Sequence, residues 1–164
     1  MFKHLGVTEY YGGTERPDDF IDLRAEVGLL TRNVKFKGDN ETSEKNQYGA
    51  NMFLHSEGDE SLISRLEYIE LHQTGQAFKV GRYSIHHHMI GTVAKSYIKG
   101  LSIHQSFNRM ITLHAVRYLT IDRNVGFNVM GHGIFMEDGV EKQNMISNNL
   151  IIMVKRSMSL LNTD

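Results

Sequence analysis

The stretch SYIKGLSIHQSFNR (residues 96–109) matches the later stretch YLTIDRNVGFNVMG (residues 118–131) at an offset of 22 positions. Ile103 is then equivalent to Val125, and Phe107 to Val129. A shorter copy, ISNNL (residues 146–150), matches IDRNV (residues 121–125) at an offset of 25 positions. Repeats of about this length, built from short strands without helices, indicate a solenoid in which successive turns of the chain stack on one another.

Apolar and polar residues alternate in short segments along the chain, which is typical of strands. Examples are Val34 and Phe36, Ile69 and Leu71, Ile111 and Leu113, and Val125, Phe127 and Val129. No apolar pattern with a spacing of three and four residues persists for three turns, so no long amphipathic helix is expected. We therefore predict an all-β chain, a single parallel β-helix over residues 1–164 with roughly six or seven coils. Residues 37–50 are polar and are expected to form an exposed loop, and Asn124 and Asn148 are expected to stack in equivalent turns.

Composition excludes several functional classes. The 18 Lys and Arg residues balance 19 Asp and Glu residues, which argues against a polybasic arm for nucleic acid or a membrane surface. The chain has no cysteine, so disulfides, thiolate metal sites and cysteine nucleophiles are excluded. No signal segment or apolar run long enough to cross a bilayer is present. The tripeptide Asn40-Glu41-Thr42 is an acceptor sequence for N-glycosylation at Asn40.

Three segments align on their apolar residues and place several histidines in register. They are SIHHHM (residues 84–89), MITLHA (residues 110–115) and GIFMED (residues 133–138), at offsets of 26 and 23 positions. Side chains alternate across a strand, so Ile85, Ile111 and Ile134 are expected to point inward, followed by an inward column of His87, Leu113 and Met136. The outward columns are then His86, Thr112 and Phe135, and beside them His88, His114 and Glu137.

The second outward column suggests chemistry. Neighbouring coils lie about 4.8 Å apart, so His88, His114 and Glu137 would lie side by side as candidate catalytic residues. His86, His88 and His114 are candidate ligands for a divalent metal. Further binding residues expected around this surface are Arg82, His86, Arg109, His132 and Asp138. The alternative is that the column is a structural ladder of stacked side chains without a ligand, and His87 is expected to be a core imidazole.

Four motifs in the same order resemble the family that includes fibrocystin, fibrocystin-L, cell surface hyaluronidase and the cell-migration-inducing hyaluronan-binding protein. The motifs are RAEVGLLTRNV (residues 24–34), GRYSIHHH (residues 81–88), SIHQSFNR (residues 102–109) and GHGIFMEDG (residues 131–139). The short link at residues 91–100 and the tail at residues 157–164 are more similar to the fibrocystin-L branch. The resemblance implies a right-handed parallel β-helix, and an internal segment of a much larger extracellular chain that is anchored at the cell membrane.

The sequence departs from the family pattern at four positions. Ser84, His87, Thr92 and Ala115 stand where the family usually has Pro, an aromatic residue, Asp and Gly. The change at Thr92 removes a carboxylate, and Ala115 adds a side chain where the family has none.

Two functions follow from the residues and the resemblance. The first is a non-catalytic extracellular scaffold or binding surface, with hyaluronan, another glycan or a cell-surface protein as partner. The second is a hyaluronan-cleaving glycosidase that uses the His88, His114 and Glu137 column. Most glycosidases use two carboxyl groups, and Glu137 and Asp138 would point to opposite faces of one strand. Arg82, Arg109 and Lys155 are expected to form a local basic strip for a polyanion.

Overall fold

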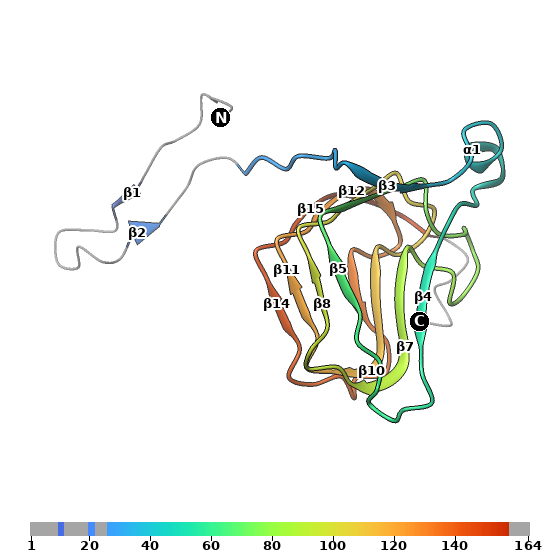
Figure 1. Cartoon of the computed structure of the whole chain (residues 1–164). Helices are drawn as coiled ribbons and strands as arrows, with labels where there is room; N and C mark the ends of the chain where they lie inside the picture. Colours follow the sequence, from blue (N-terminus) through green and yellow to red (C-terminus); the bar gives the residue numbers. More distant parts are fainter. Residues whose placement is uncertain (1–9, 12–19, 22–25, 158–164) are drawn as a thin grey trace.

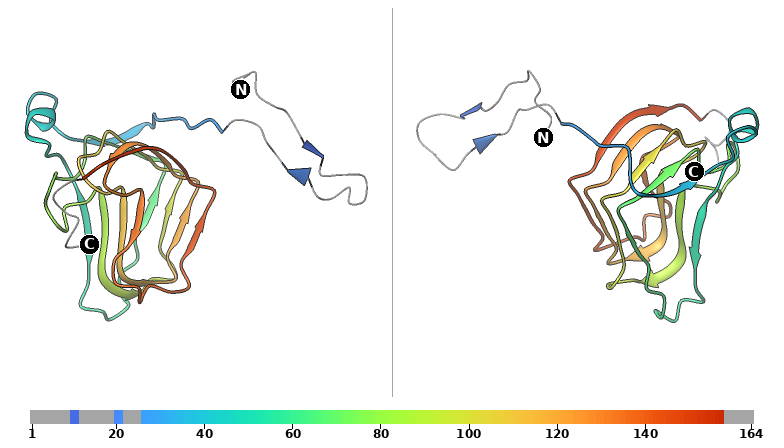
Figure 2. Two further views of the ribbon diagram at one scale, coloured as in Figure 1. Left: turned by 180° about the vertical axis from the view of Figure 1, so that it is seen from behind. Right: turned by 45° about the horizontal axis from the view of Figure 1, so that its top comes forward.

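The computed structural model describes residues 10–11, 20–21 and 26–157, and residues 34–155 form a parallel β-helix (Figure 1). Each coil contributes one strand to each of three parallel sheets. Two further views show the same stacking of strands (Figure 2). The predicted fold is therefore confirmed.

Four complete coils and the first strand of a fifth are described. The strands of the coils are, in order, β3 (Val34–Lys37), β4 (Met52–His55) and β5 (Arg65–Glu67); β6 (Ile69–His72), β7 (Ile85–Thr92) and β8 (Tyr97–Lys99); β9 (Ser102–His104), β10 (Ile111–Arg117) and β11 (Thr120–Asp122); β12 (Val125–Met130), β13 (Ile134–Met136) and β14 (Met145–Ser147); and β15 (Leu150–Lys155). Outside the solenoid, β1 (Tyr10–Tyr11) pairs antiparallel with β2 (Phe20–Ile21).

The number of described coils is smaller than the six or seven expected. The first two coils are long, because Val34 pairs with Ile69 and Glu70 pairs with Ser102, whereas from β7 onward the coils repeat every 23 to 26 residues, as from Ser102 to Val125. The extra length includes residues 37–50, where the expected loop contains the short helix α1 (Ser43–Asn46).

The three sheets have the strand orders β13-β10-β7-β4, β14-β11-β8-β5 and β15-β12-β9-β6-β3. Inward side chains from all three form the core, which includes Leu71, Ile85, Ile98, Ile111 and Ile121, each completely buried. The expected column of Ile85, Ile111 and Ile134 is confirmed by the pairing of β7, β10 and β13. Burial of these aliphatic columns is the main driving force that holds each coil on the next.

The repeat that indicated the solenoid is shifted by one residue. Ile103 pairs with Gly126, not with Val125, which pairs with Ser102 instead. A Cβ atom at Gly126 would lie 2.5 Å from the Met110 sulfur, so the Met110 side chain occupies the space that a larger residue would need. The alignment on apolar residues did not include Gly126, because glycine has no side chain. The resulting shift of one residue exchanges the inward and outward faces of the strand.

The asparagine stack is also displaced by one position. Asn124 donates its side-chain Nδ2 to Oδ1 of Asn149 at 2.9 Å, and Asn149 donates in turn to the Ile121 carbonyl at 3.0 Å. Asn148, which was expected in this stack, donates to the Asp122 carboxylate at 2.9 Å. The predicted offset of 25 positions is observed, since Ile121 pairs with Ile146; this offset makes Asn124 equivalent to Asn149, and the expectation of Asn148 in this stack is wrong.

At the edge strand β3, inward-pointing residues remain accessible. Val34 and Phe36 pair with the core residues Ile69 and Leu71 but are themselves exposed.

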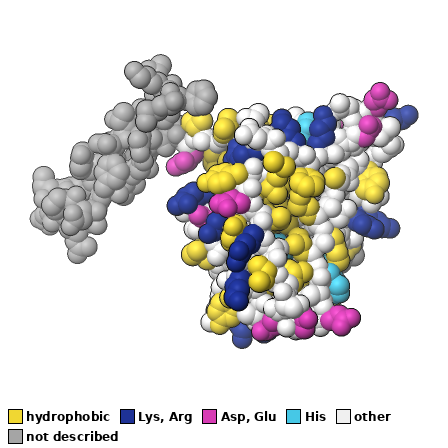
Figure 3. Space-filling view, in the orientation of Figure 1, with side chains coloured by type: hydrophobic (Ala, Val, Ile, Leu, Met, Phe, Trp, Pro, Cys, Tyr) yellow, Lys and Arg dark blue, Asp and Glu magenta, His cyan; other side chains and the backbone are white. Residues whose placement is uncertain are grey.

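On the face seen in the space-filling view, hydrophobic side chains gather in the middle and charged ones lie around them (Figure 3). Within the described part of the chain, no helix has the length and apolar character for a membrane crossing.

Candidate functional site

The outward face of the sheet β13-β10-β7-β4, called here the histidine face, carries two adjacent columns of side chains. One column contains Phe53, His86, Thr112 and Phe135, and the other contains His55, His88 and His114. Glu137 follows β13 directly, and its backbone N–H donates to the Leu113 carbonyl at 3.0 Å. The predicted register of both columns is therefore observed, with His55 as an additional member.

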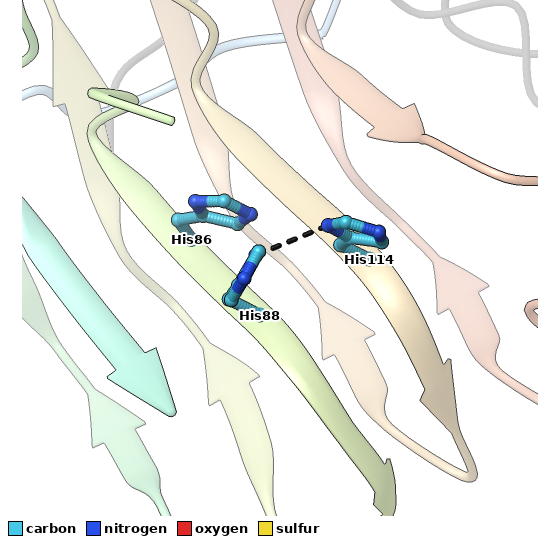
Figure 4. Close-up of side chains that lie close together, drawn as sticks. All are labelled: His86, His88 and His114. Carbon is cyan, nitrogen blue, oxygen red and sulfur yellow. Dashed lines mark hydrogen bonds between the residues drawn. The ribbon is translucent and has the colours of Figure 1, made fainter. Parts of the chain in front are cut away.

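Three imidazoles converge on this face. Nδ1 of His114 and Nδ1 of His88 are 3.0 Å apart, and the ring of His86 lies parallel to that of His114 at 6.2 Å between centroids (Figure 4). One nitrogen from each of His86, His88 and His114 can be chosen so that all three lie within 4.8 Å of one another. This spacing suits the binding of one metal ion by three histidines.

Both carboxylates that follow β13 reach this cluster. Glu137 Oε2 lies 3.7 Å from His114 Nδ1 and 3.8 Å from His86 Nε2. Asp138 Oδ2 lies 2.8 Å from His114 Nε2. The expectation that Glu137 and Asp138 point to opposite faces is wrong, because β13 ends at Met136 and strand alternation no longer applies to them.

His86 is buried although it lies on an outward face. The ring of Phe53 meets it edge-on at 5.1 Å, and the ring of Tyr83 lies at 4.8 Å. Its Nδ1 is 3.1 Å from the Gly81 carbonyl, which can only accept a hydrogen bond, so the proton of the neutral ring is on Nδ1 and the lone pair of Nε2 is directed into the cluster. Burial lowers the pKa of His86 to about 4, so this ring is neutral at physiological pH.

Burial and the neighbouring His114 also lower the pKa of His88. Neutral imidazoles are the form that binds metal ions. Within the part of the chain that the structure describes, the buried atoms His86 Nε2, Thr112 Oγ1 and Glu137 Oε2 near the cluster have no hydrogen-bond partner. Because buried polar atoms are normally satisfied, this donor set fits a cation with its bound water.

Arg109 is part of the scaffold of the cluster. Its guanidinium lies between the rings of Tyr83 and Phe135, with its central carbon 4.6 Å and 3.8 Å from the two ring centroids. Nη1 donates to the Tyr83 hydroxyl at 3.0 Å and lies 4.0 Å from Glu137 Oε1. Arg109 is buried, so it contributes a positive charge behind Glu137 and does not offer a surface contact.

The remaining predicted residues lie apart from the three histidines. His132 is exposed and packs on the Phe135 ring at 4.7 Å, and Arg82 is exposed beside Phe53. The expected basic strip is not formed, because Arg109 is buried and Lys155 lies on β15 of another sheet. Asn40 is exposed, which makes it accessible for glycosylation, and glycosylation there stays a prediction.

His87 faces the core as expected, between Leu54 and Leu113 of the neighbouring strands. It is completely buried, its Nε2 lies 2.8 Å from the Ser64 hydroxyl, and burial lowers its pKa to about 4. Ser84, the neighbouring departure from the family pattern, is also buried and accepts a hydrogen bond from the Thr74 hydroxyl at 2.8 Å.

His55 was not identified from the sequence. It pairs with His88, and its Nδ1 lies 3.0 Å from the His88 carbonyl. The signal was the match of MFLH (residues 52–55) with IHHH (residues 85–88), which was missed because its offset of 33 positions exceeds the offsets of the repeats that were found from the sequence.

Comparisons with known proteins agree with this fold. The profile of a family described as CEMIP beta-helix matches residues 47–164. Fibrocystin-L of Mus musculus is 37% identical over 99% of the chain, which spans 4% of that protein. Cell surface hyaluronidase CEMIP2 of Homo sapiens is 38% identical over 89% of the chain, which spans 11% of that protein. A G8 domain-containing protein of Dictyostelium discoideum is 40% identical over 86% of the chain, which spans 9% of it. The predicted resemblance to the fibrocystin-L family is confirmed, and the chain corresponds to a small part of each relative.

Proposed function

The chain belongs to the CEMIP β-helix family, and from this premise we propose that it is the glycan-binding part of a cell-surface protein. The binding surface is the histidine face, and His86, His88 and His114 hold a divalent metal ion there. The observation that carries the proposal is the convergence of three imidazoles with two carboxylates on one face, where several buried polar atoms have no hydrogen-bond partner among the described residues.

The metal connects the cluster with an acidic ligand. Without a cation, the carboxylates of Glu137 and Asp138 would repel an anionic glycan, and Arg109, whose Nη1 lies 4.0 Å from Glu137 Oε1, is buried. A divalent ion on the three histidines reverses the local charge and offers open coordination positions to carboxylate or hydroxyl oxygens. A relative that is 38% identical is named cell surface hyaluronidase, which makes hyaluronan the first glycan to test.

Binding of long hyaluronan to the immobilised chain tests this proposal, in zinc-containing buffer and again after chelation. We expect binding that is lost with the chelator and in the His88→Ala variant. The His72→Ala variant, which changes a histidine on another sheet, should bind as the original chain does. Equal binding with and without the chelator, or no binding at all, would contradict the proposal.

Glycan cleavage is a second candidate, and the position of the two carboxylates favours it. Glu137 and Asp138 both reach His114, so the site has two groups for acid and base roles where the sequence suggested one. Glu137 is mostly buried between the imidazoles and Arg109, and is the better placed of the two to exchange a proton with a bound sugar oxygen.

The departures from the family pattern leave this cluster intact. Thr92 lies four residues beyond His88 along β7 and lines a different pocket together with Leu62 and Lys95. Its missing carboxylate therefore removes no group from the cluster. Ala115 is adjacent to His114 and adopts a positive φ of 51°, which affects the backbone and not the ligand set.

The length of high-molecular-weight hyaluronan after incubation with the chain distinguishes binding from cleavage. Cleavage should shorten the polymer, and His114→Ala and Glu137→Ala should each abolish the shortening, while the exposed Glu67→Ala on β5 should not. A polymer of unchanged length, bound by the chain, identifies a binding protein without hydrolase activity.

A further inference from the structure

Two pockets lie on the histidine face, one at each end of the histidine cluster along β7. The first has a volume of about 310 Å³ and is lined by Phe53, Val80, Gly81 and Arg82, the last three shortly before the strand begins. The second has a volume of about 250 Å³ and is lined by Gly58, Met89, Gly91, Ala115, Arg117 and Val140. His86 and His88 lie between them in the order of the strand.

The second pocket is on the outward side because the strands are bulged there. Met89 and Ala115 have positive φ angles of 50° and 51°, and the pairing of β7 with β10 shifts between His114 and Val116. Ile90 and Val116 return to the core and are completely buried, while Met89 remains exposed. Two residues of β7, Met89 and Ile90, thus lie opposite the single Ala115 of β10, and this extra residue in β7 extends the surface of His88 toward the pocket.

Each pocket combines apolar surface with one arginine. In the first, the Phe53 ring is 50% exposed and Arg82 is exposed beside it. In the second, Met89 and Val140 are exposed. Arg117 lies close to Gly91, because a Cβ atom added to this glycine would be 3.8 Å from Arg117 Nη2. Apolar surfaces of this kind pack on the C–H face of a sugar ring, and guanidinium groups bind carboxylate or sulfate in a bidentate manner.

Glu141 directly follows the pocket residue Val140, and its carboxylate is engaged by the backbone. Glu141 Oε1 accepts hydrogen bonds from the backbone N–H groups of Ala115 at 2.7 Å and Asp138 at 3.3 Å. These bonds hold the Glu141 carboxylate against the backbone, and Arg117 remains the charged side chain that lines the pocket.

We propose that the two pockets are sugar-binding subsites for one acidic polysaccharide that runs along β7 and β10, with the histidine cluster beneath its middle. This inference rests on the proposed function, because it assigns the direction and the two outer contacts of the same ligand. A ligand held on both sides of the cluster is bound through the interior of its chain. Affinity therefore depends on having enough sugars to reach both arginines.

Hyaluronan oligosaccharides of increasing length, titrated against the zinc-loaded chain, test this arrangement. The original chain should show a step in affinity at the length that reaches both pockets. Arg82→Gln and Arg117→Gln should each weaken binding of the long oligosaccharides roughly tenfold and remove the step. Short oligosaccharides should lose affinity with only one of the two substitutions.

The matched control is Arg123→Gln, because this arginine is highly exposed and lies between β11 and β12, away from the histidine face. It should bind every oligosaccharide as the original chain does. If Arg123→Gln weakens binding as much as the pocket variants, or the pocket variants bind normally, the subsites are wrong although glycan binding stands. If the original chain binds no oligosaccharide, the proposed function itself fails.

Discussion

Histidines stack in register on two different sheets, and the two stacks differ in how their polar atoms are satisfied. On the sheet β15-β12-β9-β6-β3, the His72 and His104 rings are parallel at 4.6 Å, and His104 Nε2 lies 3.2 Å from Glu70 Oε1, while His72 contacts the Gln105 side chain. On the histidine face, His86 Nε2 and Glu137 Oε2 are buried and have no hydrogen-bond partner among residues 26–157. The stack of His72 and His104 with Glu70, called here the ladder, is therefore structural, whereas the same residue types on the histidine face form a candidate site.

The stack of His72 and His104 is completed by groups from β3 and from the segment before it. Glu70 accepts a hydrogen bond from the Arg32 backbone N–H at 3.0 Å and pairs with Lys35 Nζ at 3.1 Å. Burial alone would raise the pKa of Glu70, but these donors and His104 outweigh it and the pKa is lowered. The Glu70 carboxylate already has its hydrogen-bond and charge partners within the chain, so this stack does not need a ligand.

The largest expected difference between the two sheets is their response to acid. The pKa of buried His87 is about 4 in the folded chain, below the value of about 6.5 expected when unfolded. The unfolded chain therefore takes up the proton first, and the stability that depends on neutral His87 is complete above about pH 6.5 and is lost as the pH falls toward 4. The loss amounts to about 3 kcal/mol.

Urea unfolding at several pH values measures this loss. His87→Leu, which matches Leu54 and Leu113 in the same inward column, should make the free energy of unfolding less dependent on pH. His72→Gln on the ladder should keep the dependence of the original chain. Equal dependence in the original chain and the His87→Leu variant would show that His87 is not the titrating group.

Metal affinity should differ next most strongly. Removing one of three ligands, as in His88→Ala or His114→Ala, should weaken zinc binding about 100-fold in a calorimetric titration. His104→Ala on the ladder should leave the affinity unchanged, because its imidazole is bound to Glu70. Comparable losses in all three variants would mean that zinc binds to exposed imidazoles without a defined site.

Glu70→Gln addresses the ladder itself. The amide keeps the shape but loses the charge that Lys35 and the Arg32 backbone N–H contact. Chemical denaturation should show a destabilisation of about 2 kcal/mol, and zinc binding should not change. A change in zinc affinity would contradict the separation of the two regions.

The smallest expected effect is at Ala115. Its φ of 51° is unfavourable for any residue except glycine, and its backbone N–H donates to Glu141 at 2.7 Å. Ala115→Gly should therefore stabilise the chain by about 1 kcal/mol without altering zinc affinity. Thermal unfolding measures the gain, and a lower melting temperature would show that the alanine side chain contributes packing that outweighs the strain.

The sequence predicted the fold and the centre of the site because bulky aliphatic residues mark the register. Ile85, Ile111 and Ile134 align in three successive coils, so His88 and His114 on the same strands were placed in the correct register. Where a small residue takes the inward position, as at Gly126, the same reasoning slipped by one residue.

Other features depend on where strands end and on loop length, which alternation does not encode. Asp138 reaches His114 only because β13 stops at Met136, and His55 joins the column only after a longer coil. The burial of Arg109 between the Tyr83 and Phe135 rings joins three distant segments. No local pattern in the sequence could have indicated that contact.

The most direct test is anomalous X-ray diffraction at the zinc absorption edge from crystals grown with zinc. The account predicts a strong peak bounded by the imidazoles of His86, His88 and His114, and no comparable peak between His72 and His104. A histidine face without a peak, or a peak on the ladder instead, would contradict the claim that these three histidines form a metal site.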